Sequence, residues 1–196
     1  QLEDLAARLP IDPILVSPFD AELFGHWWFE GPEFLDLYIR KAAYDQKVFR
    51  LTTPSAYLAT HPTQQILSPS ASSWGHMGYW EVWLNENNSW IYPHLHAAAR
   101  RMTAAARNHR STRSKKTGRV LEQMARELLL AQSSDWAFLM KTGTARPYAE
   151  RRTRDHLLRF NRLHDMLANG SVDENELGRI EGIDNLFPEI NWRYYA

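Results

Sequence analysis

Apolar residues recur every three or four positions along the second half of the chain. The stripe over residues 89–109 consists of Ile91, Leu95, Ala98, Met102 and Ala105, and comparable stripes cover 117–132 and 149–168. This spacing places the apolar side chains on one face of a helix, so it predicts three long amphipathic helices. Asn169 and Gly170 supply a C-terminal stop for the third helix. We also predict a short helix over 173–182 and an aromatic tail, 186–195, that docks on the helices.

The first half of the chain mixes helical spacing with short apolar runs. The predicted elements are a helix over 1–10, a buried strand over 14–16, a helix over 32–46 and a second short strand over 48–51. This order is typical of an α/β fold with parallel strands. Two strands do not make a stable sheet alone. Either the rest of the sheet lies in an N-terminal part outside this chain, or the strand interpretation is wrong. Residues 54–88 are predicted to be mostly irregular.

Composition changes this picture little, except for the aromatic residues. The 196 residues are 44% hydrophobic and 23% charged, and their formal net charge is zero. No global field therefore favours nucleic acid or an acidic partner. The unusual total is eight tryptophans. Flat aromatic faces in loops beside acids suit the apolar face of a sugar ring or of a base.

What the sequence lacks excludes several classes of function. Without cysteine there is no disulfide framework and no cysteine-based metal site, which suits a reducing compartment, and we expect the cytoplasm. No apolar run approaches the ~20 residues of a membrane span. His94 and His96 diverge by about 200° on a helix, which is poor metal geometry, so we expect no metal. The basic stretch 108–117 is interpreted as a solvated loop, not as a nucleic-acid site.

The stretch 17–32 crowds acidic and aromatic residues into a predicted strand-to-helix turn. Such turns lie at the ends of strands where α/β barrels place their chemistry. Asp20 and Glu22 are two apart and face the same way on an extended strand end, as paired carboxylates for acid–base chemistry would. From spacing alone, a helix-capping acid is the commoner explanation. Phe24 and Trp28 favour chemistry, because aromatic neighbours exclude water from a carboxyl group.

Two further clusters carry candidate chemistry. Trp74, Trp80 and Trp83 lie in a segment whose aromatic density is too high for a linker. They either line a ligand site or form an aromatic minicore that joins two domains, and for Trp80 both explanations stay open. The sequence Ser133-Ser134-Asp135-Trp136 interrupts an otherwise apolar helical run. Taken alone, it is a helix break with an N-cap for the next helical turn.

These motifs resemble glycoside hydrolase family 57. The motif over 17–32 is similar to the family's fourth conserved region, and its segment from Gly25 to Gly31, GHWWFEG, most resembles the family's 1,4-α-glucan branching enzymes. The segment around Trp74 to Trp83 resembles the fifth region, and Ser134-Asp135-Trp136 resembles a motif of the helical domain. The resemblance implies that residues 1–70 finish an incomplete, distorted (β/α) barrel of seven strands. It further implies that residues 71–196 form an α-helical domain that completes the substrate cleft.

The resemblance also implies a role for each motif residue. Asp20 matches the general acid/base of a retaining mechanism. The expected substrate-binding residues are His26, Trp28, Trp74, Trp83 and Asp135. A retaining mechanism needs a second carboxylate about 5–5.5 Å away, and in this family it is a nucleophilic Glu from an earlier region, outside this chain. The chain alone is therefore expected to be inactive. No metal or organic cofactor is implied.

The resemblance thus implies the C-terminal portion of a 1,4-α-glucan branching enzyme, which moves glucan segments from α-1,4 bonds onto 6-hydroxyl groups as α-1,6 branches. The predicted partners are an α-glucan such as amylose or glycogen and the N-terminal part that carries the nucleophile. Two alternatives stay open. One is another outcome within the family, α-amylase or 4-α-glucanotransferase. The other is a non-catalytic glucan-binding module.

Overall fold

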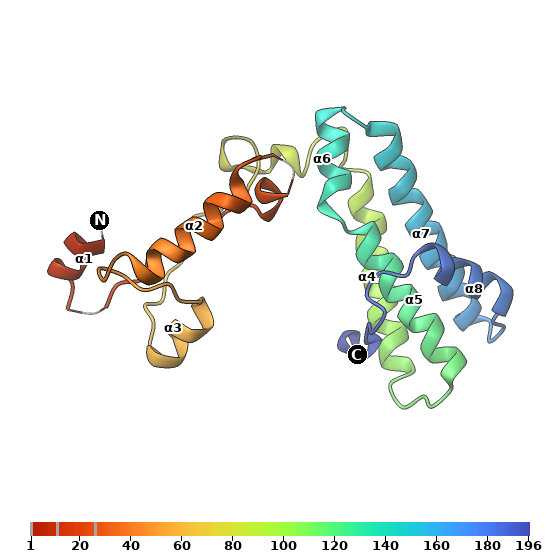
Figure 1. Cartoon of the computed structure of the whole chain (residues 1–196). Coiled ribbons are helices and arrows are strands. Elements are labelled where there is room, and N and C mark those ends of the chain that lie inside the picture. The colour runs from red at the N-terminus through yellow and green to blue at the C-terminus, as the bar shows by residue number, and fades with distance from the viewer. Residues whose placement is uncertain (1, 11, 26) are drawn as a thin grey trace. The chain divides into compact units, whose positions relative to one another are not determined.

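The computed structural model describes residues 2–10, 12–25 and 27–196, and their internal contacts divide the chain into two units (Figure 1). Unit 1 comprises Gln1–Pro69 and unit 2 comprises Ser70–Ala196. All regular elements in the described residues are helices. Those of unit 1 are α1 Leu2–Arg8, η1 Ala21–Phe24, α2 Gly31–Tyr44 and α3 Pro54–Thr60. Those of unit 2 are η2 His76–Gly78, η3 Trp80–Val82, α4 Ile91–Asn108, α5 Lys115–Ala131, α6 Ser134–Thr142, α7 Arg146–Ala168, α8 Glu174–Ile183 and η4 Trp192–Tyr195.

The two predicted strands are absent from the described residues, so the α/β part of the predicted fold class is wrong for this chain. The run 14–16 is not a buried strand: Leu15 is 53% exposed and Val16 is 64% exposed. In the run 48–51, the Gln46 side chain accepts hydrogen bonds from the backbone N–H of Val48 at 2.8 Å and of Phe49 at 3.0 Å. Apolar runs form strands only beside a neighbour that completes the hydrogen-bond ladder, and no part of the described chain supplies one. The described residues therefore contribute no strand to a barrel sheet.

Helix α3 was also missed by the prediction of an irregular segment over 54–88. Thr53 accepts a hydrogen bond from the backbone N–H of Ala56 at 3.2 Å, and Pro54 opens the first turn. Proline at this position costs no hydrogen bond, because the first N–H groups of a helix have no partner within it. The proline is therefore a start signal here and not a breaker.

The predicted helices of unit 2 are confirmed, as is their buried face. In Figure 1, α5 runs beside α4 and α7 over most of their lengths, and α5 and α7 form the most extensive contact between helices. The fully buried side chains of this core include Met102 from α4, Leu121, Met124 and Leu128 from α5, Phe160 and Leu163 from α7, and Ile180 from α8. Helix α7 ends at Ala168, and Gly170 then adopts a positive φ of 64°. Glycine makes that conformation cheap, which explains the stop.

The aromatic tail docks on the helices, as predicted. Trp192 is 1% exposed and packs in the core of unit 2. The Arg126 guanidinium of α5 donates hydrogen bonds to the backbone carbonyls of Leu186, Phe187 and Pro188, at 2.8 to 3.3 Å. These bonds satisfy carbonyl groups of a segment without regular structure and hold it against α5. Separately, within the described residues no helix combines the length and apolar character that crossing a bilayer requires.

Candidate functional site

Asp20 stands at the entry to η1, with its side chain exposed to solvent. Its backbone carbonyl accepts the first hydrogen bond of the turn, from Leu23 N at 3.1 Å. Its side chain, however, makes no capping hydrogen bond. Asp20 is therefore not a helix-capping residue in the structure, although spacing alone made capping the commoner explanation. Glu22, two residues on, is exposed as well, so both carboxyl groups are available to a ligand of unit 1.

A chain of aromatic rings fixes the shape of the motif around Asp20. Neighbouring rings in the series Phe19, Phe24, Trp28, Phe34 and Tyr38 have centroids 4.8 to 6.0 Å apart. Gly31 is buried, and a Cβ atom there would meet the rings of Phe24 and Trp28 at 3.1 to 3.2 Å. The glycine thus lets α2 begin directly against the two rings. Trp28 is half-buried in this stack, and the predicted sugar contact His26 lies outside the described residues.

In unit 2 the structure brings the segments of Trp74 and Trp83 together. The Ser73 hydroxyl donates to the carbonyl of Tyr79 at 2.5 Å, which closes the turn that carries Trp74. Gly75 lies at the crossing point: a Cβ atom there would be 2.5 Å from the Tyr79 carbonyl oxygen and 3.2 Å from Trp83 Nε1. Only glycine permits this approach. Trp74 is 79% exposed beside it, whereas Trp83 is half-buried.

Asp135 occupies the first turn of α6, and its exposed carboxylate has no side-chain or backbone partner among the described residues. The helix break at this point is confirmed, because α5 ends at Ala131 and α6 begins at Ser134. The side chain of Trp136, in contrast, packs in the core. It is 9% exposed, and its Nε1–H donates to the Leu130 carbonyl at 2.6 Å, across the break. The buried indole therefore fixes the end of the helix on which Asp135 is displayed.

The segment around Trp74 to Trp83, called the tryptophan segment below, is attached to α6 by three different interactions. The buried amide of Asn88 donates to Val82 O at 2.9 Å and to Ala137 O at 3.1 Å. The ammonium of Lys141 forms an ion pair with Glu81, and that hydrogen bond holds the pKa of the Glu81 carboxyl below its usual range. The ring of Trp83 lies 6.3 Å from the ring of Phe138. Trp83 and Asp135, far apart in sequence, are thus brought onto neighbouring elements.

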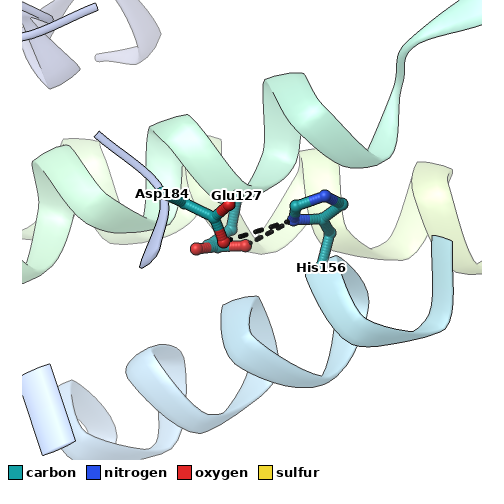
Figure 2. Close-up of side chains that lie close together, drawn as sticks. All are labelled: Glu127, His156 and Asp184. Carbon is teal, nitrogen blue, oxygen red and sulfur yellow. Dashed lines mark hydrogen bonds and ion pairs between the residues drawn. The ribbon is translucent and has the colours of Figure 1, made fainter. Parts of the chain in front are cut away.

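The sequence analysis missed a buried polar cluster formed by Glu127, His156 and Asp184. Figure 2 shows the three side chains pointing toward one another from α5, α7 and the segment after α8. His156 Nδ1 lies 2.8 Å from Glu127 Oε2 and 3.7 Å from Asp184 Oδ2. All three side chains are at most 6% exposed. Glutamate and histidine within otherwise apolar helical stripes are the signal that could have found two of them.

Arginine and glutamine side chains complete this cluster. Arg159 Nη1 forms an ion pair with Asp184 Oδ2 at 2.6 Å, and Arg152 Nη2 lies 2.9 Å from His156 Nε2. Gln123 donates to Glu127 Oε1 at 3.1 Å. Burial raises the pKa of Glu127, and the hydrogen bond to His156 opposes that shift.

Three ligand atoms within 4.8 Å of one another could hold a metal ion in principle. Here all three side chains already have partners. His156 and Asp184 contact arginines, and the carboxylate of Glu127 pairs with His156. A cation would have to displace the His156 to Glu127 hydrogen bond and share Asp184 with Arg159. The arrangement therefore fits a structural network that joins three segments, and Trp136 stacks on it through His156 at 6.4 Å.

Comparison with protein families and curated proteins identifies the relatives of the chain. Residues 94–195, just over half of the chain, match the family model described as 1,4-alpha-glucan branching enzyme, C-terminal. A 1,4-alpha-glucan branching enzyme from Thermococcus kodakarensis is 39% identical over 90% of the chain. A probable 1,4-alpha-glucan branching enzyme from Mycobacterium tuberculosis is 31% identical over 81% of it. The chain spans only 26% and 31% of the lengths of these two proteins.

Solved structures match nearly the whole chain. The GH57-type branching enzyme from Pyrococcus horikoshii matches 99% of the chain with a TM-score of 0.81 and 35% identity, and the chain covers 37% of it. The alpha-amylase AmyC from Thermotoga maritima matches 100% with a TM-score of 0.76 and 43% identity, and the chain covers 36% of it. Since a family model covers more than half of the sequence, the chain belongs to the family of C-terminal domains of 1,4-alpha-glucan branching enzymes.

Proposed function

We propose that the chain is the C-terminal part of an enzyme that makes α-1,6 branches in α-1,4-glucan by a retaining transglycosylation. The observation that carries this proposal is the match to GH57 branching enzymes, which extends over 99% of the chain and so includes both units. The chain spans 26 to 37% of the proteins it matches. The nucleophilic Glu of the mechanism is accordingly assigned to the part of those proteins that the chain does not cover.

In the proposed reaction Asp20 acts first as an acid and then as a base. The nucleophilic Glu attacks the anomeric carbon, the α-1,4 bond breaks, and Asp20 gives its proton to the leaving 4-oxygen. In the second half Asp20 takes the proton from an acceptor 6-hydroxyl, whose oxygen displaces the Glu and forms the α-1,6 bond. Its exposed, uncapped carboxyl group supports this role, because no interaction with the described residues of unit 1 occupies it.

Sugar binding is assigned to residues of both units. Trp74 and Trp83 are proposed to stack on glucose rings, and Asp135 is proposed to accept hydrogen bonds from sugar hydroxyls. Trp28 and His26 are proposed to contact the sugar held near Asp20. A surface of aromatic rings favours transfer to a sugar hydroxyl over hydrolysis, because it binds an acceptor glucan while it excludes water. In this proposal residues 1–70 are the C-terminal end of the catalytic part, without strands of its sheet in the described residues, and residues 71–196 complete the substrate cleft.

An α-amylase function is the second candidate. It is favoured by one observation, the 43% identity to the Thermotoga maritima alpha-amylase over the whole chain. Both reactions would use the same acid and the same nucleophile, and they differ only in whether a sugar hydroxyl or water completes the second step. Sequence similarity to the two groups therefore does not separate them, whereas their products do.

Product analysis on amylose tests the proposal and separates its alternatives. The complete enzyme, expressed with its native upstream portion, is expected to form new α-1,6 linkages with little gain in reducing ends. The 196-residue chain alone is expected to be inactive. Many reducing ends without α-1,6 linkages would favour amylase. Activity of the chain alone would place the second carboxylate within it, and no activity from either protein would favour a glucan-binding module.

A further inference from the structure

The sequence motifs leave one exposed aromatic residue of α6 without a role. Phe138 is 45% exposed, although it belongs to the short helix whose other face is buried in the core. The buried residues of this helix are Trp136, Ala137 and Met140. Asp135 and Phe138 are three residues apart, so their side chains lie on the same outward side of the helix. An exposed phenylalanine one turn from an unpaired carboxylate calls for an explanation.

Phe138 does not stand alone, because its ring pairs with that of Trp83. The two centroids are 6.3 Å apart and the planes are inclined by 35°, so the rings form two adjoining surfaces and not a parallel stack. The backbone of Trp83 is also fixed, because its carbonyl accepts a hydrogen bond from the Tyr92 hydroxyl. Asn88 and Lys141 then bind the tryptophan segment to α6. The relative position of the two rings is therefore fixed within unit 2.

We propose that Phe138, together with Trp83 and Asp135, forms one binding surface for a segment of α-1,4-glucan. This inference rests on the proposed function and adds to it a substrate-contact residue. A glucose unit carries apolar C–H faces and a rim of hydroxyl groups. Two inclined aromatic rings match the faces of successive units of a twisted glucan, and the carboxylate matches the hydroxyl rim.

The unpaired carboxylate favours sugar over protein as the occupant of this surface. Asp135 has no hydrogen-bond or ion-pair partner among the described residues. An apolar protein surface packed over Phe138 would bury that charge next to the ring without a compensating partner, which is costly. Sugar hydroxyls supply hydrogen-bond donors at the same place where the ring requires an apolar contact. Both requirements are met by a single ligand.

The test compares substitutions of Phe138 that keep or remove the ring. Binding of maltoheptaose is measured by titration calorimetry on the complete enzyme carrying Asp20→Asn, so that the sugar is not consumed. Phe138→Leu keeps an apolar side chain but loses the ring, and we expect the Kd to rise about tenfold. Phe138→Trp keeps a ring and should bind within about twofold of the parent. Leu158→Ala, at a 66% exposed position on α7, is the matched control and should not change the Kd.

The possible outcomes separate this inference from the proposed function. An unchanged Kd in Phe138→Leu, with weaker binding in Trp83→Ala and Asp135→Ala, would overturn the role of Phe138 alone. A lower thermal midpoint in Phe138→Leu with an unchanged Kd would mean that protein covers the ring, and would overturn it as well. If neither Trp83→Ala nor Asp135→Ala weakens binding, the glucan site on unit 2 is wrong as a whole. A tenfold loss in Phe138→Leu that Phe138→Trp restores would support it.

Discussion

The two units of the chain differ in what they bury. Unit 2 has a continuous core to which α4 through α8 and η4 contribute. In unit 1, Ala42 is the one buried hydrophobic residue within the described ranges, while α2 leaves Phe34, Leu37 and Ile39 more than 40% exposed. Unit 2 therefore contains the interactions that stabilise it, whereas the apolar faces of unit 1 would be stabilised by a surface that these residues do not supply. The comparison teaches that the stabilising core and the proposed acid/base residue Asp20 are located in different parts of one chain.

The largest expected effect is a loss of activity without a loss of stability. Asp20→Asn in the complete enzyme should lower the branching rate on amylose by about 10³-fold, because the amide cannot transfer the proton. The thermal midpoint should stay the same, since the Asp20 side chain is exposed and caps no helix. Turnover within tenfold of the parent enzyme would remove Asp20 from the mechanism.

The core of unit 2 should show the opposite behaviour. Phe160 is completely buried in α7, and Phe160→Ala is expected to lower the free energy of unfolding by about 3–5 kcal/mol. Leu158→Ala on the same helix, at a 66% exposed position, should cost less than about 0.5 kcal/mol. Urea denaturation of the 196-residue chain measures both. Equal costs at the two positions would contradict the assignment of the stabilising core to this face of α7.

The buried polar cluster should contribute a smaller and pH-dependent share of stability. Glu127→Ala leaves the His156 and Gln123 donors without acceptors and should cost about 3 kcal/mol at neutral pH. Because burial raises the pKa of Glu127, the folded protein holds this proton more tightly than the unfolded protein does. The stability that the Glu127 proton contributes to the folded state is fully present below the ordinary pKa near 4.5, and it is lost as the pH rises through the higher pKa of the folded protein.

Glu127→Gln is the matched control for this pH dependence. Glutamine has no proton to lose, so the advantage of the parent chain over Glu127→Gln should shrink as the pH rises from acidic to neutral. Denaturation curves over that range measure the difference. An advantage that grows with pH would mean that the pKa of Glu127 is lowered in the folded protein.

The smallest effect concerns the exposed face of α2. Leu37 is 49% exposed, so Leu37→Ser in the 196-residue chain should change stability by less than about 0.5 kcal/mol. In the complete enzyme, where we propose that this face is covered, the same substitution should cost about 1–2 kcal/mol. Chemical denaturation of the two proteins measures both costs. Identical costs would mean that Leu37 stays exposed in both.

The sequence was sufficient for the helices of unit 2 because their apolar spacing and their stop signals agree. It was misleading for 14–16 and 48–51, since an apolar run becomes a strand only next to another strand, which a single run does not reveal. The start of α3 at Pro54 was not predicted, because proline breaks a helix in its interior but favours the start of a helix at the first turn.

The candidate site was predictable to a similar extent. Trp74, Trp83 and Asp135 could be named from their motifs, but the contact that relates Trp83 to α6 passes through Phe138 and Asn88, which belong to no motif. Glu127 and His156 are 29 residues apart in the chain and meet only through the packing of α5 on α7, and Asp184 joins them from the end of α8.

Two adjacent residues of helix α6, Asp135 and Trp136, have opposite surroundings. Asp135 is exposed, whereas Trp136 is buried and stacks on His156. Consecutive side chains on a helix point about 100° apart, so one step along the chain leads from the proposed glucan surface to the protein interior. On that proposal, mutations at the outward positions 135 and 138 are expected to alter the preferred glucan while the fold is preserved. The proposal thus predicts that substrate preference and thermal tolerance can diverge independently among descendants of this protein.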